Sequence, residues 1–85
     1  MAEDVEIGKV GDYFAHVGVA GIDLTGVLKV GDRIRIKGHT TDLERVVASI
    51  QIEHESVQEA KVGDRIGVKV SERCRDGDHV YLVSD

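Results

Sequence analysis

The sequence predicts an all-β domain that closes into a small barrel, and three observations carry the prediction. Ten glycines in 85 residues indicate many tight turns, because glycine reaches positive φ angles without strain. Gly-Asp pairs, which are typical of turns, recur along the chain. Runs in which apolar and polar residues alternate follow them, with the two-residue period of a half-buried strand. Short strands of this kind bury their apolar faces, and lose their exposed edges, by closing into a barrel.

A repeated tetrapeptide marks the turns. Lys-Val-Gly-Asp occurs identically at residues 9–12, 29–32 and 61–64, and Asp-Gly-Asp at 76–78 is a looser echo. Alternating runs follow the copies at 29–32 and 61–64. Each copy is therefore expected to form a turn that launches a strand. The spacings are irregular, so neither a solenoid nor a propeller is predicted.

Six strands are predicted, over residues 5–11, 16–24, 32–38, 43–54, 64–71 and 78–83. The first leads into a Gly-Asp pair, and the second contains glycines that allow curvature or a close neighbour. The third, fifth and sixth follow Gly-Asp turns. The fourth is rich in Val and Ile, and its Ile50/Ile52 alternation favours a strand over a helix. Residues 55–60 are expected to form one helical turn or a loop.

The alternation also predicts the core, because alternate residues of a strand share one face. The side chains expected to point inward are Leu28, Val30, Ile34, Ile36, Ile50, Ile52, Ile66, Val68, Val70, Val80 and Leu82. A chain of 85 residues has the length of one domain. We therefore expect a single domain over residues 1–85, with residues 1–4 as a disordered tail.

Composition restricts the location and the partners. The formal charge of -5 argues against nonspecific coating of nucleic acid, although it leaves room for a local basic face. The single cysteine, Cys74, excludes an internal disulfide and favours a reducing, cytoplasmic location. The acidic N-terminus lacks the features of a signal peptide, and no apolar stretch is long enough to cross a bilayer. No membrane association is predicted.

No catalytic residue, metal site or cofactor is predicted, and the chain is not expected to be an enzyme. The four histidines are scattered without metal-ligand spacing, at residues 16, 39, 54 and 79. The arginines beside Cys74 would suit a reactive thiol, but a partly buried structural cysteine is the favoured interpretation. Neither a phosphate-binding loop nor a dinucleotide fingerprint is present. The chain is therefore not expected to bind nucleotides.

Two rows of basic residues are the candidate contact sites. One row lies on one predicted strand and the other on a second strand, and they would form a positive patch if the strands were neighbours. The favoured interpretation is cross-strand pairing with Asp and Glu; the other is contact with an RNA backbone or an acidic partner. The rows are Arg33, Arg35 and Lys37, and Arg65 and Lys69.

An aromatic cluster near the first turn is a further candidate contact. Tyr13, Phe14 and His16 lie close together in the sequence. These side chains would stack on a base or on a partner side chain, or they would plug one end of the barrel, which is the favoured interpretation.

Two segments resemble the second domain of Tu-type translation elongation factors. The first is Gly26-Val-Leu-Lys-Val-Gly-Asp-Arg-Ile-Arg-Ile-Lys-Gly38, and the second comprises residues 47–52 and 59–68. The similarity spans residues 5–83 and implies a six-stranded Greek-key barrel that docks a GTPase domain and contacts tRNA ends or ribosomal RNA. The GTPase domain itself is absent from this chain, so GTP binding is not implied.

The resemblance favours a non-enzymatic binding module associated with translation, which contacts RNA, a ribosome or a translation-factor surface. The same barrel recurs as an accessory module of other proteins, including collagenase-like peptidases. The alternative is therefore a protein–protein accessory subunit, which supplies a barrel in trans to an enzyme or a GTPase. The acidic balance and small size suit this alternative.

Overall fold

The computed structural model describes residues 5–53, 55–70 and 72–83. This part of the chain contains strands and no helix, which confirms the all-β prediction. The predicted tail at residues 1–4 lies outside it. The strands are β1 (Val5–Phe14), β2 (Val19–Leu24), β3 (Leu28–Lys29), β4 (Arg33–Lys37), β5 (Asp42–Val46), β6 (Ile50–Ile52), β7 (Glu55–Val57), β8 (Glu59–Ala60), β9 (Arg65–Lys69) and β10 (His79–Leu82).

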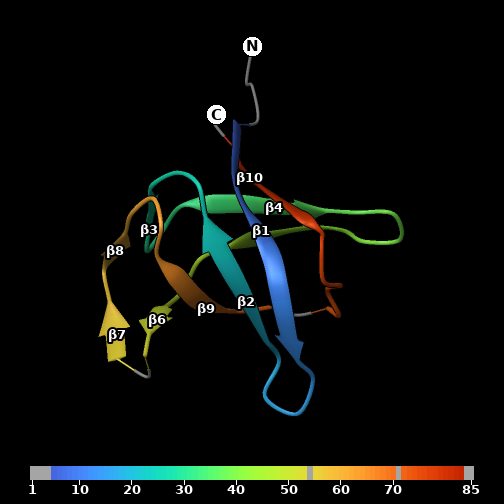
Figure 1. Cartoon of the computed structure of the whole chain (residues 1–85), viewed down its shortest axis with the longest axis horizontal. Coiled ribbons are helices and arrows are strands. Elements are labelled where there is room, and N and C mark those ends of the chain that lie inside the picture. Colours follow the sequence, from blue (N-terminus) through green and yellow to red (C-terminus); the bar gives the residue numbers. More distant parts are fainter. Residues whose placement is uncertain (1–4, 54, 71, 84–85) are drawn as a thin grey trace.

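Eight of these strands form one antiparallel sheet, in the order β5-β4-β10-β1-β2-β9-β6-β7. The sheet curls strongly, and the small β3–β8 ladder lies beside it (Figure 1). Three hairpins project from the body: β1–β2, β4–β5 and β6–β7 (Figure 1). Residues 55–60, expected as a helical turn or a loop, instead supply β7 and β8.

The predicted closed six-stranded barrel is not found. The strand order of the described residues has two ends, β5 and β7. The reason lies in the predicted strand 43–54, which breaks at Val47. The backbone N–H of Val47 donates to Asp32 O over 2.8 Å, and its C=O accepts from Gly31 N over 2.8 Å. Because a turn occupies both groups of Val47, the strand cannot continue, and its halves β5 and β6 pair near opposite ends of the sheet.

The core lies inside the curl. Eight of the predicted inward side chains are buried, and Val30, Ile52 and Leu82 pack partly buried against them. Alternate residues of β1 and β2 add core side chains that the alternating runs did not identify, including Val10 and Ile22. The two-residue period therefore predicts most of the core correctly. The full buried set is Ile7, Val10, Ala20, Ile22, Leu24, Leu28, Ile34, Ile36, Leu43, Val47, Ile50, Ala60, Ile66, Val68, Val70, Cys74 and Val80.

Three turns share one hydrogen-bonding pattern. In the turns at 29–32, 61–64 and 75–78, the Asp side chain accepts from the backbone N–H of the first residue, over 2.8–2.9 Å. The glycine of each turn has a φ between 92° and 98°. The glycine N–H and the Asp C=O then bind both backbone groups of one buried residue elsewhere, Val47, Leu24 or Val10 respectively. The turn prediction is correct for these three segments.

The first tetrapeptide copy, at residues 9–12, does not form a turn. It lies inside β1, where the register against β2 shifts between Val10 and Asp12. Gly77 and Asp78 hold the backbone of Val10 on one side, and β2 pairs with the segment on the other. These long-range hydrogen bonds keep the chain extended through the bulge. The turn prediction is wrong here for that reason.

Candidate binding groove between two hairpins

An open groove of about 500 Å³ lies on the outer face of the sheet. One side consists of the end of β1, the turn and the start of β2; the other is β6 with the residue that follows it. The floor comes from β9, which runs between the two hairpins (Figure 1). The volume of the groove is in the range of sites that hold a small ligand or a few side chains. The lining residues are Phe14, His16, Val17, Val19, Gln51, Glu53, Arg65, Ile66 and Gly67.

Two glycines face each other on the outer face beside the groove. Gly21 of β2 is directly opposite Gly67 of β9, and Gly67 is also opposite Gln51 of β6. Residues on either side of each glycine, such as Ala20 and Val68, point into the core, so the glycines belong to the outer face. A Cβ atom on Gly67 would lie 3.2 Å from Val19 Cγ1. The glycines therefore let Val19 and Phe14 pack close to the sheet beside the groove.

Exposed apolar side chains line the groove. Phe14 is 46% exposed and Val17 is 49% exposed, although both are hydrophobic. Phe14 is opposite Val19 in the β1–β2 ladder, in the row next to the glycine pair. The Phe14 ring approaches the glycine row, since a Cβ atom on Gly21 would lie 3.7 Å from Phe14 Cε2. The groove thus offers an apolar surface to solvent.

Acidic and basic side chains are mixed around the groove, because Lys69 lies opposite Val19 and Lys9 lies opposite Asp23 on the same outer face. Arg65 donates from Nε to Asp23 Oδ1 over 2.8 Å, and this bond raises the pKa of Arg65. Asp12, opposite Gly21, adds a second carboxylate close enough to raise that pKa further. Glu53 lies on the groove lining, and its carboxylate has no ion pair or hydrogen bond within the described part of the chain. Arg65 is therefore paired with Asp23, and the outer face around the groove carries no clear excess of either charge.

Glu53 also has an unusual backbone conformation. Its φ is 49°, a left-handed value, and no other described residue except glycine has a positive φ. The chain reverses here between Ile52 and Glu55, which are paired residues of β6 and β7. Asparagine, aspartate and glycine are the residues that such two-residue reversals favour. A glutamate at this position costs backbone energy.

The predicted basic row on β4 faces outward but is mixed with acidic groups. Arg35 makes two hydrogen bonds to Asp42, from Nε at 2.9 Å and from Nη2 at 3.0 Å, and this lowers the pKa of Asp42. Lys37 is opposite Asp42 on β5 and His79 on β10. Arg33, at the start of the strand, is exposed and makes a further interaction of its own. For Arg35, the favoured interpretation of cross-strand pairing is therefore what the structure shows.

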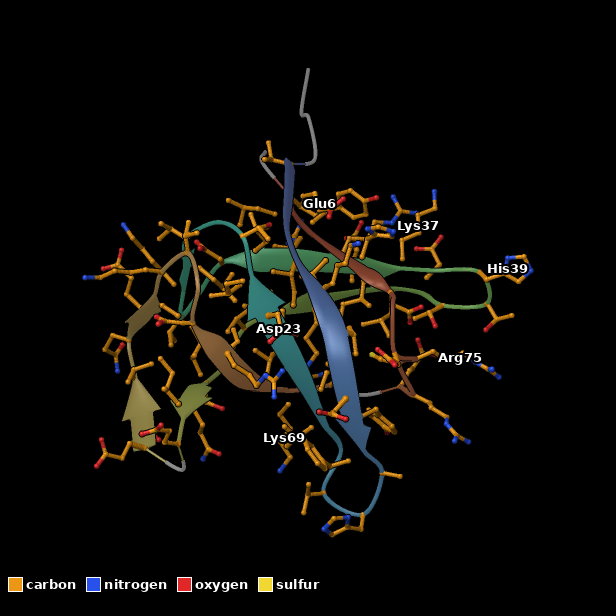
Figure 2. The ribbon with its side chains drawn as sticks, in the orientation of Figure 1. Glu6, Asp23, Lys37, His39, Lys69 and Arg75 are labelled. Carbon is orange, nitrogen blue, oxygen red and sulfur yellow. The ribbon has the colours of Figure 1, made fainter. Side chains whose placement is uncertain are left out.

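The two predicted basic rows do not form one patch. β4 lies between β5 and β10, whereas β9, which carries Arg65 and Lys69, lies between β2 and β6. Lys37 and Lys69 accordingly lie on separate parts of the molecule (Figure 2). The condition for a joint positive patch, that the two strands be neighbours, is not met.

The predicted aromatic cluster is also divided. Phe14 and His16 line the groove described above. Tyr13 points the other way, packs partly buried against the core and borders a separate hollow with residues 73–76. Only Phe14 and His16 therefore contribute to the groove.

Cys74 is a structural residue. It is 2% exposed, and burial together with Asp78 and Glu72 raises the pKa of its thiol to about 11. Its Sγ lies 3.8 Å from Glu72 O. The thiol is therefore protonated near neutral pH, which makes it a poor nucleophile.

Other chemistry that the side chains offer is limited. Over residues 5–53, 55–70 and 72–83, no three His, Cys, Asp or Glu side chains are placed to hold a metal ion. His39 lies at the tip of the β4–β5 hairpin, away from the other labelled groups (Figure 2). The same ranges contain no helix with the length and hydropathy needed to span a membrane.

Sequence reasoning named Phe14, His16 and Arg65 as contacts but missed the other residues at the groove. Gly67 interrupts an alternating run, and an isolated glycine inside a strand pattern signals a bulge or a close approach. That signal was available, but the pairing of Gly67 with Gly21 depends on the order of the strands in the sheet. Glu53 fell within a predicted strand, and nothing in its neighbours marked a left-handed residue. Val17 and Val19 fall inside the strand predicted at 16–24, and that prediction assigns them no contact.

Comparison with known proteins gives relatives by sequence and by fold. No protein-family model matches the chain. A Methanocaldococcus jannaschii protein named as an uncharacterized protease is 48% identical over 82 residues, which is 95% of this chain. A protein from Porphyromonas gingivalis named collagenase is 36% identical over 81 residues, or 93% of this chain. In both cases the match covers 20% of the relative, so the chain spans about a fifth of their length.

The fold is known from a solved structure. The C-terminal domain of a Geobacillus thermoleovorans protein, named as a U32 peptidase, superimposes with a TM-score of 0.84. The superposition covers 89% of each chain at 18% sequence identity. At this identity the likeness establishes the fold alone.

These findings overturn the resemblance to Tu-type elongation factors, and with it the function in translation. The relatives are named protease and collagenase, and the matching solved domain comes from a peptidase. The prediction was wrong because Gly-Asp turns followed by alternating strands specify how the chain folds, and one such fold carries many functions. The chain is similar in sequence to one segment of proteins named as protease and collagenase, and in fold to the C-terminal domain of a U32 peptidase.

Proposed function

We propose that this chain is a non-catalytic accessory module of a U32-type peptidase. The observation that carries the proposal is the 48% identity over 82 residues to a segment that makes up only 20% of a protein named as a protease. The other four-fifths of that relative have no counterpart in this chain and leave ample length for a catalytic domain. The proposal corresponds to the alternative function given from the sequence, an accessory subunit of an enzyme or a GTPase. It specifies that the enzyme is a peptidase.

The chemistry of the site supports a binding role. The groove combines exposed apolar side chains with charged groups of both signs, which suits contact with a polypeptide. The free thiol, Cys74, is buried and holds its proton near neutral pH. A free cysteine also fits the cytoplasmic location that the proposal retains.

A domain exchange tests the proposal. In the Porphyromonas gingivalis collagenase, this chain replaces the segment to which it is 36% identical. We expect the chimera to cleave gelatin and this chain alone to cleave none. The same collagenase with the segment replaced by a flexible linker is the control. The proposal fails if this chain alone cleaves gelatin, or if the folded chimera is no more active than the linker variant.

A further inference from the structure

We infer that three exposed valines near the start of β1 dock this chain onto an apolar surface of the catalytic part of the peptidase. These residues, which we call the valine patch, are Val5, Val27 and Val62, with exposed fractions of 57%, 44% and 66%. The identity of the partner rests on the proposed function, whereas the patch itself rests on the structure.

Two neighbouring loops bring Val27 and Val62 together. Their segments run antiparallel, and the β3–β8 ladder joins them on one side of the two valines. On the other side, Leu24 makes backbone hydrogen bonds to residues 63–64 over 2.9–3.0 Å. Val27 and Val62 therefore lie on adjacent segments, in the short stretch between two fixed points.

The start of β1 lies against the same loops. The backbone N–H groups of Thr25 and Gly26 both donate to Ile7 O, over 2.7 and 3.1 Å. A Cβ atom on Gly26 would lie 2.9 Å from Ile7 Cγ2, so the loop packs directly on β1. Val5 precedes Ile7 by two residues, and Val27 follows Gly26. The start of β1 and the loops beside β3 and β8 accordingly occupy one end of the molecule (Figure 1).

Val62 does little for the stability of the chain itself. Residues 61–64 repeat the Lys-Val-Gly-Asp of residues 29–32, and both copies form the same turn. Val30, in the turn at 29–32, packs partly buried against the core, whereas Val62 at the same position is mostly in solvent. Turns favour glycine, proline, asparagine, aspartate and serine. A partner surface that covers Val62 would supply the burial that the isolated chain lacks.

The relatives indicate where the partner lies. The matched segment makes up 20% of the proteins named as protease and collagenase. The matching solved domain is the C-terminal domain of its peptidase, so the rest of that polypeptide precedes it. In this fold the N-terminal side is the start of β1, where Val5 lies. A preceding catalytic part would therefore meet the valine patch directly.

A joined catalytic part suits the small patch better than a second copy of this chain. A stable dimer needs about 800 Å² from each copy, and three partly exposed valines supply only a fraction of that area. A domain joined by a short linker has an effective concentration in the millimolar range, so a small contact suffices.

Charge does not select the partner of the patch. Lys29 and Glu59 are opposite each other in the β3–β8 ladder. Glu6 follows Val5, and Lys61 precedes Val62. Since both signs border the patch, its apolar side chains determine what it binds, and the matching surface on the catalytic part is apolar.

The experiment compares hydrogen exchange, followed by mass spectrometry, in the collagenase chimera and in this chain alone. We expect the amides of residues 24–30 and 58–64 to exchange more slowly in the chimera, because the docked catalytic part covers them. The groove is the internal control. It lies at the other end of β1, roughly 30 Å away for a strand of ten residues, so residues 14–19 and 51–53 should exchange equally in both proteins.

Variants connect this protection to the valines. In the chimera, Val62→Asp should speed exchange of residues 24–30 and 58–64 by about fivefold, the effect of losing roughly half a buried valine. Val27→Asp should act in the same way. Val17→Asp is the matched control, because Val17 is also an exposed turn valine but lies at the groove. In this chain alone, Val62→Asp should not lower the urea midpoint, since turns accept aspartate; a lower midpoint would indicate a structural role.

Four results would overturn the inference. These are equal exchange in the chimera and the isolated chain, slower exchange at the groove instead, equal effects of Val17→Asp and Val62→Asp, or protection of the isolated chain that grows with its concentration. The last result would assign the patch to a second copy.

Gelatin cleavage by the chimera separates this outcome from the proposed function. An active chimera without slower exchange at the patch keeps the accessory module and rejects the docking surface. A chimera no more active than the linker variant, but with protection that Val62→Asp abolishes, keeps the docking surface and rejects the role in proteolysis.

Discussion

At the scale of the residue, burial decides what each polar or reactive group does. Cys74 is flanked in sequence by Arg73 and Arg75, a setting that would favour a thiolate if the sulfur were exposed. The fold instead buries the thiol and places Asp78 and Glu72 near it, and both effects raise its pKa. Neighbours in the sequence were a poor guide because the arginine side chains remain in solvent.

This pKa predicts how stability depends on pH. The thiol keeps its proton in the folded chain up to about pH 11, whereas an unperturbed thiol loses it near 9.0. The folded state therefore holds more protons over that interval, and the free energy of unfolding should fall as the pH rises through it. Urea titrations between pH 8 and 11 check this, with Cys74→Ala as the control that lacks the thiol's contribution. Rapid reaction of the native thiol with a disulfide reagent at pH 8 would contradict it.

At the scale of the element, the shared turn pattern shows how a local signal can hold distant segments together. In each of the turns at 29–32, 61–64 and 75–78, the carboxylate of the last residue, an aspartate, accepts a hydrogen bond from the backbone N–H of the first residue. Each then binds the backbone of a buried residue in another segment. The turn satisfies backbone groups that would otherwise be buried without partners.

The repeated tetrapeptide supplies its own control. Asp64 accepts from Lys61 N over 2.9 Å, whereas Asp12 follows the same three residues, Lys-Val-Gly, but lies in β1. Asp64→Ala should lower the free energy of unfolding by about 1 kcal/mol, the value of a typical hydrogen bond. Asp12→Ala should cost less than about 0.5 kcal/mol, as surface changes usually do. Equal losses in urea unfolding would mean that the turn bond contributes nothing specific.

At the scale of the whole molecule, one core connects all the large strands. The radius of gyration is 11.4 Å, close to the value of about 12 Å expected for a compact domain of this length. The buried residues form one cluster, to which β1, β2, β4, β5, β6, β9 and β10 contribute. We therefore expect the chain to unfold as a single cooperative unit.

A substitution in the core tests this expectation. Ile22 is fully buried, and Ile22→Ala should cost about 2–5 kcal/mol, a large part of the stability of a small domain. The control is Val62→Ala, because Val62 is 66% exposed and should change stability by less than about 0.5 kcal/mol. Far-ultraviolet circular dichroism and NMR signals should report one common transition in urea for both variants. Separate transitions would mean that the core is divided.

How much could be predicted differs between the fold and the groove. Alternation placed Ile34, Ile36 and Val68 in the core correctly, because the period of a strand is local. The groove was not predicted, because Gly21 and Gly67 are far apart in the chain and meet only through the order of the strands. The pairing of Arg65 with Asp23, 42 positions apart, has the same origin. Closure of the barrel was predicted wrongly because the Val47 backbone bonds to a distant turn.

The sequence by itself determined the all-β class, the core faces of β4, β9 and β10 and the turns at three Gly-Asp pairs. All three depend on side-chain alternation and on the positive φ of glycine, which act over a few residues. Tertiary structure alone decided that Lys-Val-Gly-Asp at 9–12 stays extended while its identical copies turn, and that two glycines meet beside a groove. Hydrogen bonds between distant segments made these choices, and no local pattern specifies the partner of such a bond.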